Sequence, residues 1–555
     1  MGRTKDIDNE IIELWKKYNP SAAYTQGFDS EAGVFFIPSG DNLNTVIIKA
    51  KQLKEKTSDQ MQLKVLDAIL EELEFDEPQM ILEQVLGSIF NHMVKEGIVP
   101  NHMKSLLNGS IEAVRVTKEK YADKEVPIGV KVLTLYRLDG ILGILDVVSA
   151  STEDSTLRNL CSTLASEVKS FVSLFDVDDF GHGEFERVYS IFEKYGFDLG
   201  RKAVYDRALK RAYDYSETSD ELEEKALGWL NNELREIRRL MPVLAKKLDC
   251  SEDYDAISQA INSKLHIRPE EVVDVTKTVR DVVMRFVNEN LARINPRYDT
   301  RVIETPKYLT GTIPSAAAGF FDTFTDKPFQ LYFVTTDKTR DPIKSLPDLI
   351  NTLVHEEYGH CLHHSNSATN FIEKLRSIEL FYNSLEGPIT EGLSFNREIE
   401  FLEVLRKLEE EKSYTDSQRG LVKIAEKYGG LSLLSDVYEF ETRRWRLIRF
   451  LRVIGDVRLN TGKQGMIEFL HWAERTTGLH KASIYYQLFP AHEYFPGYAT
   501  CYAVVGQEIR AMEREIADAD RVEFQTYLCS IGSPPRSIYK EKLKSKLEML
   551  KNASS

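Results

Sequence analysis

Two histidines and two glutamates stand together in the segment His355-Glu356-Glu357-Tyr358-Gly359-His360. The chain contains only 11 histidines, and His363 and His364 follow this segment directly. Imidazole nitrogens and carboxylate oxygens are ligands that zinc and similar metals take in proteins. So dense a cluster predicts a metal site; the alternative is a polar helix face with scattered histidines.

The spacing of the two histidines differs from that of the usual zinc-binding helix. In a His-Glu-x-x-His helix the ligands are four residues apart on one face, and a general-base glutamate follows the first. Here His355 and His360 are five residues apart, which separates them by roughly 140° on an ideal α-helix. A π-bulge, which Gly359 would ease, widens one turn to i→i+5 hydrogen bonding and would bring the two side chains together.

The residues before the histidines predict a helix. Ser345 can cap its N-terminus, and Pro347 stands in its first turn. A broad apolar stripe at helical spacing consists of Leu346, Leu349, Ile350, Leu353 and Val354.

A catalytic zinc site needs three protein ligands and an open position for water. Glu391 is the best third ligand, because it begins the next long helix and follows His360 by 31 residues. That separation allows a turn and an antiparallel helix to return the carboxylate to the metal. Glu398 lies two turns later on the same face, where it could orient a ligand histidine. We expect one Zn²⁺ per chain, bound by His355, His360 and Glu391.

Composition restricts the class of protein. The 555 residues suffice for two lobes with their own cores, and 42% hydrophobic with 29% charged residues is typical of a soluble globular chain. The low counts of 18 prolines and 30 glycines predict a mainly α-helical fold. A net charge of −15 argues against nucleic acid as a partner.

No disulfide framework and no membrane segment is indicated. The five cysteines are scattered and form no Cys-x-x-Cys pair. Residues 1–12 are polar, without the apolar core of a signal peptide, and no apolar run reaches the eighteen residues of a membrane span. We therefore expect a reduced, cytoplasmic protein with no membrane partner; the oligomeric state is not indicated.

The chain divides into two regions. Residues 1–265 are predicted to form an N-terminal lobe of successive amphipathic helices, and residues 266–555 a catalytic lobe that carries the metal site. The clearest helices of the first region are expected at residues 59–74, 78–96, 157–175 and 219–247.

A β-strand is predicted at residues 329–335, which alternate and end 20 residues before His355. It follows a stretch rich in helix breakers, 295–327. A strand beside a metal helix can pair with an extended peptide through main-chain hydrogen bonds, which makes Tyr332 a candidate substrate contact. A small structural sheet is an equally good interpretation.

One predicted helix is rich in arginine. It carries Arg443, Arg444, Arg446, Arg449, Arg452 and Arg458. An arginine fork suits a substrate C-terminal carboxylate, and Arg458 is the candidate for that contact. The alternative is that most of these arginines pair with some of the 87 acidic residues.

Four motifs in a fixed order carry a family resemblance. They are His355-Glu356-x-x-Gly359-His360, Glu391-Gly392 with Glu398, Asp456-Val457-Arg458-Leu459-Asn460-Thr461-Gly462, and Tyr494-Phe495-Pro496-Gly497-Tyr498-Ala499. Over about residues 320–510 the chain resembles the helical zinc metallopeptidases of the gluzincin type. It is most similar to a family classed as a domain of unknown function with a His-Glu-x-x-Pro-Gly-His motif. The thermostable carboxypeptidase (Taq) and thimet oligopeptidase groups are also similar.

The resemblance implies a two-lobed helical fold with a deep central cleft and a small β element beside the metal helix. It implies a metallopeptidase that hydrolyses short peptides, as a carboxypeptidase or an oligopeptidase. It gives His355, His360 and Glu391 as zinc ligands and Glu356 as the base. The histidine spacing, one residue longer than His-Glu-x-x-His, leaves the base open between Glu356 and Glu357.

The same resemblance makes Tyr498 and Tyr502 candidates for stabilising the oxyanion. His492 is a further catalytic candidate, one residue from its expected spacing. Asn460 stands where the most similar family often has a histidine.

Two other functions compete with hydrolysis. A di-iron carboxylate oxidoreductase would use the two Glu-x-x-His elements Glu357-x-x-His360 and Glu468-x-x-His471, with Glu391 between them. That interpretation leaves His355 and Glu356 unexplained. The other competitor is a helical metal-binding protein without catalysis.

Overall fold

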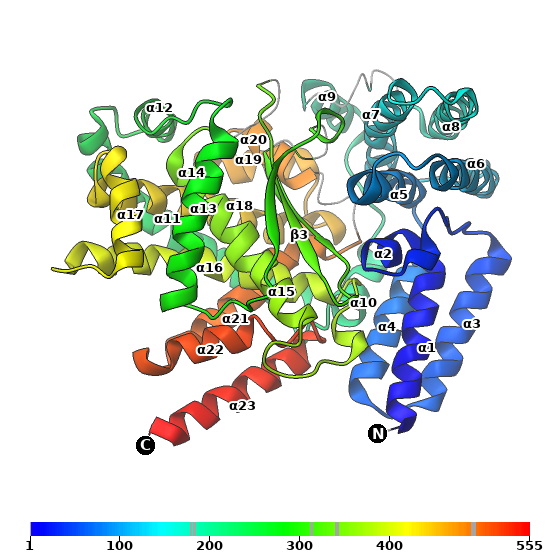
Figure 1. Cartoon of the computed structure of the whole chain (residues 1–555). Coiled ribbons are helices and arrows are strands. Elements are labelled where there is room, and N and C mark those ends of the chain that lie inside the picture. The colour runs from blue at the N-terminus through cyan, green and yellow to red at the C-terminus, as the bar shows by residue number, and fades with distance from the viewer. Residues whose placement is uncertain are drawn as a thin grey trace.

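In the computed structural model, helices account for most of the chain (Figure 1). The structure describes residues 2–177, 180, 185–310, 313, 315–338, 343–489 and 495–554. The mainly α-helical fold predicted from the sequence is thereby confirmed. None of the helices formed by these residues is long and apolar enough to cross a membrane.

Among the described residues, the regular elements of the first half of the chain are all helices. Its helices are α1 (Gly2–Tyr18), α2 (Pro20–Thr25), α3 (Gly40–Lys56), α4 (Gln60–Glu74), α5 (Gln79–Glu96), α6 (Pro100–Tyr121), α7 (Ile128–Ala150), α8 (Ser155–Val172), α9 (Phe185–Tyr195), α10 (Lys202–Ala212), α11 (Ser219–Leu248), α12 (Tyr254–Lys264) and α13 (Val272–Asn290). The four helices predicted most clearly correspond to α4, α5, α8 and α11, with ends that agree within three residues. Polar caps help to fix these ends: Asp59, for example, accepts the Gln62 N–H at the start of α4.

Helices dominate the second half as well. They are α14 (Leu346–Leu353), η5 (Val354–Cys361), α15 (Leu362–Ala368), α16 (Glu386–Glu410), α17 (Asp416–Lys427), α18 (Leu431–Asn460), α19 (Met466–Thr477), α20 (Lys481–Leu488), η8 (Tyr498–Tyr502), α21 (Val504–Glu513), α22 (Arg521–Leu528) and α23 (Arg536–Ser554). Figure 1 shows α1, α3 and α4 beside one another near the N-terminus, while α22 and α23 lie near the C-terminus.

A three-stranded sheet stands between these helices. The strands are β1 (Thr300–Glu304), β2 (Ala316–Phe321) and β3 (Phe329–Val334), in the order β1-β3-β2. β3 is the predicted strand, and it pairs parallel to β1 and antiparallel to β2. β2 forms within residues 295–327, the stretch that is rich in helix-breaking residues. Its outer edge contacts η5.

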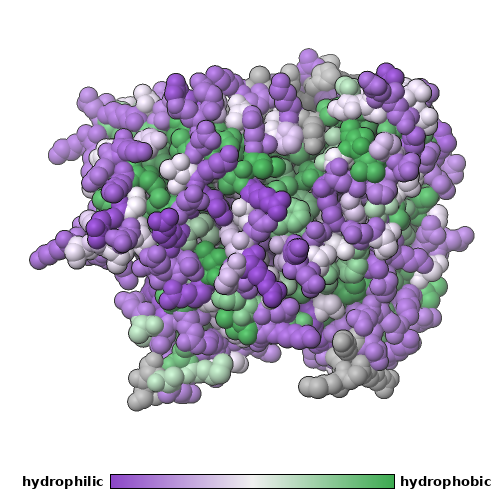
Figure 2. Space-filling view, viewed as in Figure 1, coloured by the Kyte–Doolittle hydropathy of each residue, from purple (hydrophilic) through white to green (hydrophobic). Residues whose placement is uncertain are grey.

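One hydrophobic core cluster joins the two halves of the chain. It includes Leu230 on α11 and Val279 on α13, on either side of residue 265. The predicted division into lobes at this residue stays a prediction. The outer face in Figure 2 is mainly hydrophilic, with hydrophobic residues dispersed among charged ones, which agrees with the composition.

Candidate metal centre

The two histidines lie in a π-helical segment, η5, between α14 and α15. Because i→i+5 hydrogen bonding places residues five apart above one another, His355 and His360 point to the same side. Their ring centroids are 5.0 Å apart. Gly359 allows η5 to approach α16, since a Cβ atom there would lie 2.6 Å from Ser394 Cβ. The distortion predicted from the histidine spacing is therefore present.

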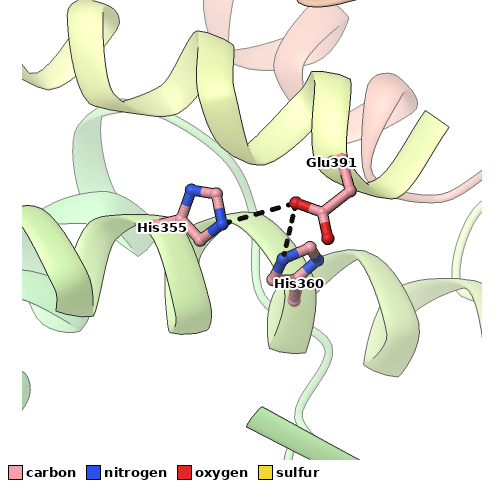
Figure 3. A group of neighbouring side chains, drawn as sticks. All are labelled: His355, His360 and Glu391. Carbon is pink, nitrogen blue, oxygen red and sulfur yellow. Dashed lines mark ion pairs between the residues drawn. The ribbon is translucent and has the colours of Figure 1, made fainter. Parts of the chain in front are cut away.

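Glu391 completes a three-residue cluster. It projects from α16, which runs alongside the histidine helix (Figure 3), and its Oε2 lies 3.6 Å from His355 Nε2 and 3.7 Å from His360 Nε2. Tetrahedral zinc with ordinary bond lengths holds its ligand atoms about 3.3–3.6 Å apart. Glu391 Oε2 is buried and has no hydrogen-bond partner among the described residues. Within the described part of the chain, this is the one His/Cys/Asp/Glu group with metal-binding spacing.

Opposite charges already face each other in this cluster. Burial and Arg449 lower the pKa of His355, but the Glu391 and Glu398 carboxylates outweigh them and raise it to about 9. Burial raises the pKa of Glu391, yet the neighbouring His355, His360 and Arg449 hold it at about 2. The Glu391 carboxylate thus stays ionised and needs a positive charge beside it. A divalent cation would supply that charge.

A buried carboxylate orients the first histidine. Glu398 Oε1 lies 2.8 Å from His355 Nδ1 and is fully buried. Arg449 of α18 donates to the other oxygen of Glu398. A hydrogen bond at Nδ1 directs Nε2 of the same ring toward the metal position, as in carboxylate–histidine–zinc arrangements.

The two neighbouring glutamates of η5 point to different surroundings. Glu356 lines the cavity beside the cluster and accepts a hydrogen bond of 2.9 Å from the Ala318 N–H of β2. Glu357 is fully buried away from it, where Arg280 and the Tyr298 hydroxyl donate to its Oε1 at 2.7 Å each. Glu356 is therefore the glutamate that a bound substrate can reach.

A cavity of about 890 Å³ opens in front of these residues. Residues of the first half line it, among them Glu72 of α4 and, between α4 and α5, Asp76 and Glu77. The cluster, residues of β2 and residues of α18 line it as well.

The two predicted tyrosines also line this cavity. Tyr498 and Tyr502 lie on η8, and their hydroxyl oxygens are 3.1 Å apart. Gly497 begins this turn with φ +98°, and a Cβ atom there would lie 2.9 Å from the Tyr213 ring. Glycine thus permits the turn that presents both tyrosines.

Two predicted substrate contacts are not at the cavity. Arg458 donates to Glu223 at 2.6 Å and packs on the Trp472 ring, so its charge is satisfied elsewhere. Tyr332 is fully buried in the core, because β3 is the central strand and β2 takes the cavity side. Both assignments are corrected here. His492 lies outside the described residues.

The residues of the alternative di-iron site are dispersed. Glu357 is occupied by Arg280, Glu468 accepts the Gly465 N–H at the start of α19, and His471 Nε2 lies 2.9 Å from the Tyr189 hydroxyl. They do not surround His360.

Sequence reasoning missed two features of the cavity. One is the β2 edge, because its Ala-Ala-Ala-Gly sequence has low strand propensity. The other is Arg452, which lines the cavity together with Trp445 and Arg449. The i, i+4, i+7 spacing of these three residues on α18 was the available signal.

No protein-family profile and no curated protein sequence matches this chain. Two solved structures are similar over nearly its whole length. One, from Shewanella oneidensis, is described as "a putative lipoprotein of unknown function"; it has a TM-score of 0.65 and 15% identity, with 97% of this chain and 98% of that one covered. The other, "the putative lipoprotein from Colwellia psychrerythraea", has a TM-score of 0.62 and 12% identity, with 98% and 99% covered. At these identities the likeness shows the fold alone.

These two names contradict the predicted cytoplasmic location, because lipidation holds a protein at a membrane surface. The prediction rested on the polar residues 1–12 and on the lack of a long apolar run. It is withdrawn.

Proposed function

We propose that this chain is a zinc-dependent metallopeptidase that hydrolyses short peptides. The observation that carries the proposal is the set of His355, His360 and Glu391, in which the buried Glu391 Oε2 has no hydrogen-bond partner in the part of the chain that the structure describes. Two nitrogens and one oxygen match the ligands of catalytic zinc sites, which keep a further position open. The proposal includes kinship with the helical metallopeptidases that the sequence motifs resemble.

A bound zinc ion would supply a Lewis acid and a water molecule with a pKa near 7. The Glu356 carboxylate would take the proton of the attacking water and pass it to the leaving amine. Its hydrogen bond from Ala318 fixes the position of this carboxylate beside the cluster. Glu357 is not available for that role, because Arg280 and Tyr298 occupy it.

The pair Tyr498 and Tyr502 supports stabilisation of the oxyanion in the proposed reaction. Hydrogen-bond donors that face a developing oxyanion stabilise the transition state, and removing one such donor costs about 10²–10³ in rate. Tyr498 and Tyr502 line the cavity and lie in hydrogen-bonding contact with each other. Either hydroxyl could donate to the oxyanion while the other holds it in place.

The edge of β2 supports a peptide as the substrate. On an edge strand, alternate residues direct their N–H and C=O groups away from the sheet. Ala316 and Ala318 line the cavity and share this orientation. The Ala318 N–H already donates to Glu356, so a peptide would pair with the groups of Ala316 and with the Ala318 C=O. An extended peptide can add to such an edge through main-chain hydrogen bonds, largely without regard to its side chains.

The size of the cavity supports short peptides. Its volume of about 890 Å³ falls within the roughly 300–1,000 Å³ of small-ligand sites. Residues of the first half, such as Glu72 and Lys120, line it together with the cluster. A cavity enclosed in this way suits a short peptide substrate better than a folded protein.

The first test combines metal content with peptide cleavage. Protein purified without added metal is expected to contain about one zinc per chain and to cleave short peptides, with loss of activity in chelator and recovery on zinc addition. Glu356→Gln should keep the zinc and lower kcat by about 10²–10⁴.

Glu357→Gln serves as the matched control, because it makes the same change one residue away. It should lower stability through the loss of the Arg280 ion pair but leave the kcat of folded protein near that of the parent. Full activity of Glu356→Gln would move the base elsewhere. A zinc-loaded parent that cleaves no peptide would reject the proposal in favour of a non-catalytic metal protein.

A further inference from the structure

Helix α18 carries a row of arginines, and all but one are neutralised by a carboxylate. The paired ones are Arg443 and Arg446 with Glu233, Arg444 with Glu441, Arg449 with Glu398, and Arg458 with Glu223. Arg452 has no carboxylate partner among the described residues. An arginine charge that is partly removed from water without a counter-ion is costly, so the exception is informative.

The contacts of Arg452 leave part of its guanidinium group open. Its Nε donates to the Gln487 backbone oxygen and its Nη2 to the Gln487 side chain, both at 2.8 Å. Among the described residues Nη1 has no hydrogen-bond partner. The guanidinium carbon lies 4.8 Å from the centre of the Tyr502 ring, and Arg452 lines the cavity. Gln487 and Tyr502 thus fix a cation that faces the space for substrate.

We infer that Arg452 is the specificity residue that binds a carboxylate group of the peptide substrate. The planar guanidinium fork matches a carboxylate in two parallel hydrogen bonds. The inference rests on the proposed function, because it assumes that a peptide occupies this cavity.

The position of Arg452 relative to the cluster supports this role. Arg449, three residues earlier on α18, lies 3.3 Å from His355 Nδ1 through its Nη2. The helical rise places Arg452 about 4.5 Å further along the axis, while one extended peptide residue spans about 3.3–3.6 Å. A carboxylate one or two residues from the cleaved bond can therefore reach it.

The rest of the cavity favours a singly charged anion. Asp76, Glu356 and Glu391 also line it. Such negative surroundings disfavour a doubly charged phosphate more than a carboxylate. The carboxylate has two possible sources, the free C-terminus of the peptide and an acidic side chain.

Calorimetric binding to the zinc-loaded Glu356→Gln protein tests the inference without requiring turnover. Three peptides are compared: a neutral peptide as the free acid, the same peptide as its C-terminal amide, and that amide with one internal residue replaced by aspartate. One carboxylate peptide is expected to bind about 10- to 100-fold more tightly than the neutral amide. A preference for the free acid assigns the C-terminus, whereas a preference for the aspartate peptide assigns the side chain.

Introducing Arg452→Gln into the Glu356→Gln protein should abolish the preference for the carboxylate peptide. Arg452→Lys should retain part of the preference, because lysine keeps the charge but not the planar fork. The ratio of the two peptide affinities, measured on one protein, does not depend on the fraction of that protein that is folded. Arg458→Gln, on the same helix but outside the cavity, should leave the ratio unchanged. No preference in the parent, no binding of any peptide, or a preference that survives Arg452→Gln would overturn the inference. Cleavage of peptides by the wild type together with such a result would leave the proposed function intact.

Discussion

The contact between η5 and α16 contains two buried polar clusters that balance their charge differently. In one, Glu400 of α16 accepts hydrogen bonds from Arg397 at 2.8 Å and from the Tyr358 hydroxyl at 2.9 Å. In the other, Glu391 faces His355 and His360 at 3.6 and 3.7 Å, beyond hydrogen-bonding distance. The Arg397 cluster supplies its own cation, whereas the histidine cluster leaves room for one. Glu391 and Glu400 each have one buried oxygen without a hydrogen-bond partner among the described residues, so neither burial nor such an oxygen is enough to mark a metal site. The two imidazole nitrogens beside Glu391 make the difference.

The largest expected effect comes from removing the carboxylate of each cluster in turn. Glu391→Ala should abolish zinc binding and activity, because only two ligands remain. Glu400→Ala should leave Arg397 buried without its partner and lower the free energy of unfolding by about 3–5 kcal/mol. Elemental analysis and denaturant unfolding of both variants measure the contrast. If Glu391→Ala kept its zinc, or folded Glu400→Ala protein lost it, the distinction between the clusters would be wrong.

Asp456 of α18 shows what burial costs a carboxylate that no metal is expected to neutralise. It accepts from the Tyr205 hydroxyl at 2.6 Å and from Asn460 at 2.9 Å, but burial outweighs these bonds and raises its pKa to about 7. A raised carboxyl pKa means that the folded state holds the proton more tightly, so ionisation destabilises it. Stability should fall as pH rises from about 4 to 7, by up to about 4 kcal/mol, and then level off.

The asparagine in Asp456→Asn cannot ionise, so this variant should lack the loss of stability that ionisation of Asp456 causes as the pH rises. Thermal unfolding of both proteins at pH 5 and pH 8 measures it, since other titrating groups contribute to both alike. An equal change of Tm with pH in the two proteins would contradict the assignment.

The smallest expected effect concerns the residue behind the first histidine. Glu398→Gln keeps the shape but removes the charge that orients His355, and zinc affinity should weaken about 10- to 100-fold. Competition with a chromophoric chelator measures this affinity. Glu441→Gln is the control, because Glu441 is a buried glutamate of α18 whose partner is Arg444. Equal zinc affinities of the two variants would remove Glu398 from the metal site.

Local chemistry explains which features the sequence could predict. The helix ends follow caps and apolar periodicity, so α4 and α11 agree closely with their predicted ranges. The π-helical turn follows from the five-residue spacing of the histidines. At the start of α14, however, Ser345 takes the N-cap position without a capping hydrogen bond, and its buried hydroxyl has no partner among the residues that the structure describes.

The remaining errors concern which side of an element faces the cavity. Arg452 and Arg458 stand on one helix and carry the same charge, and only the packing of α18 decides that Arg452 lines the cavity. Tyr332 alternates correctly along β3, but β2 covers that strand on the cavity side. Tertiary packing of this kind is not encoded in a short window of residues.

The π-helical turn also sets the phase of the chain beyond it. One residue corresponds to about 100° of rotation on a regular helix, so residues before and after η5 follow two different angular registers. In α15, Asn366 bonds the Asn295 N–H at 3.0 Å and His363 lies 3.1 Å from Ser533. Shortening the turn by one residue to obtain a regular His-Glu-x-x-His helix would rotate both side chains away from these partners. The fold can therefore accommodate substitution of a single ligand residue more easily than deletion of a residue from this turn.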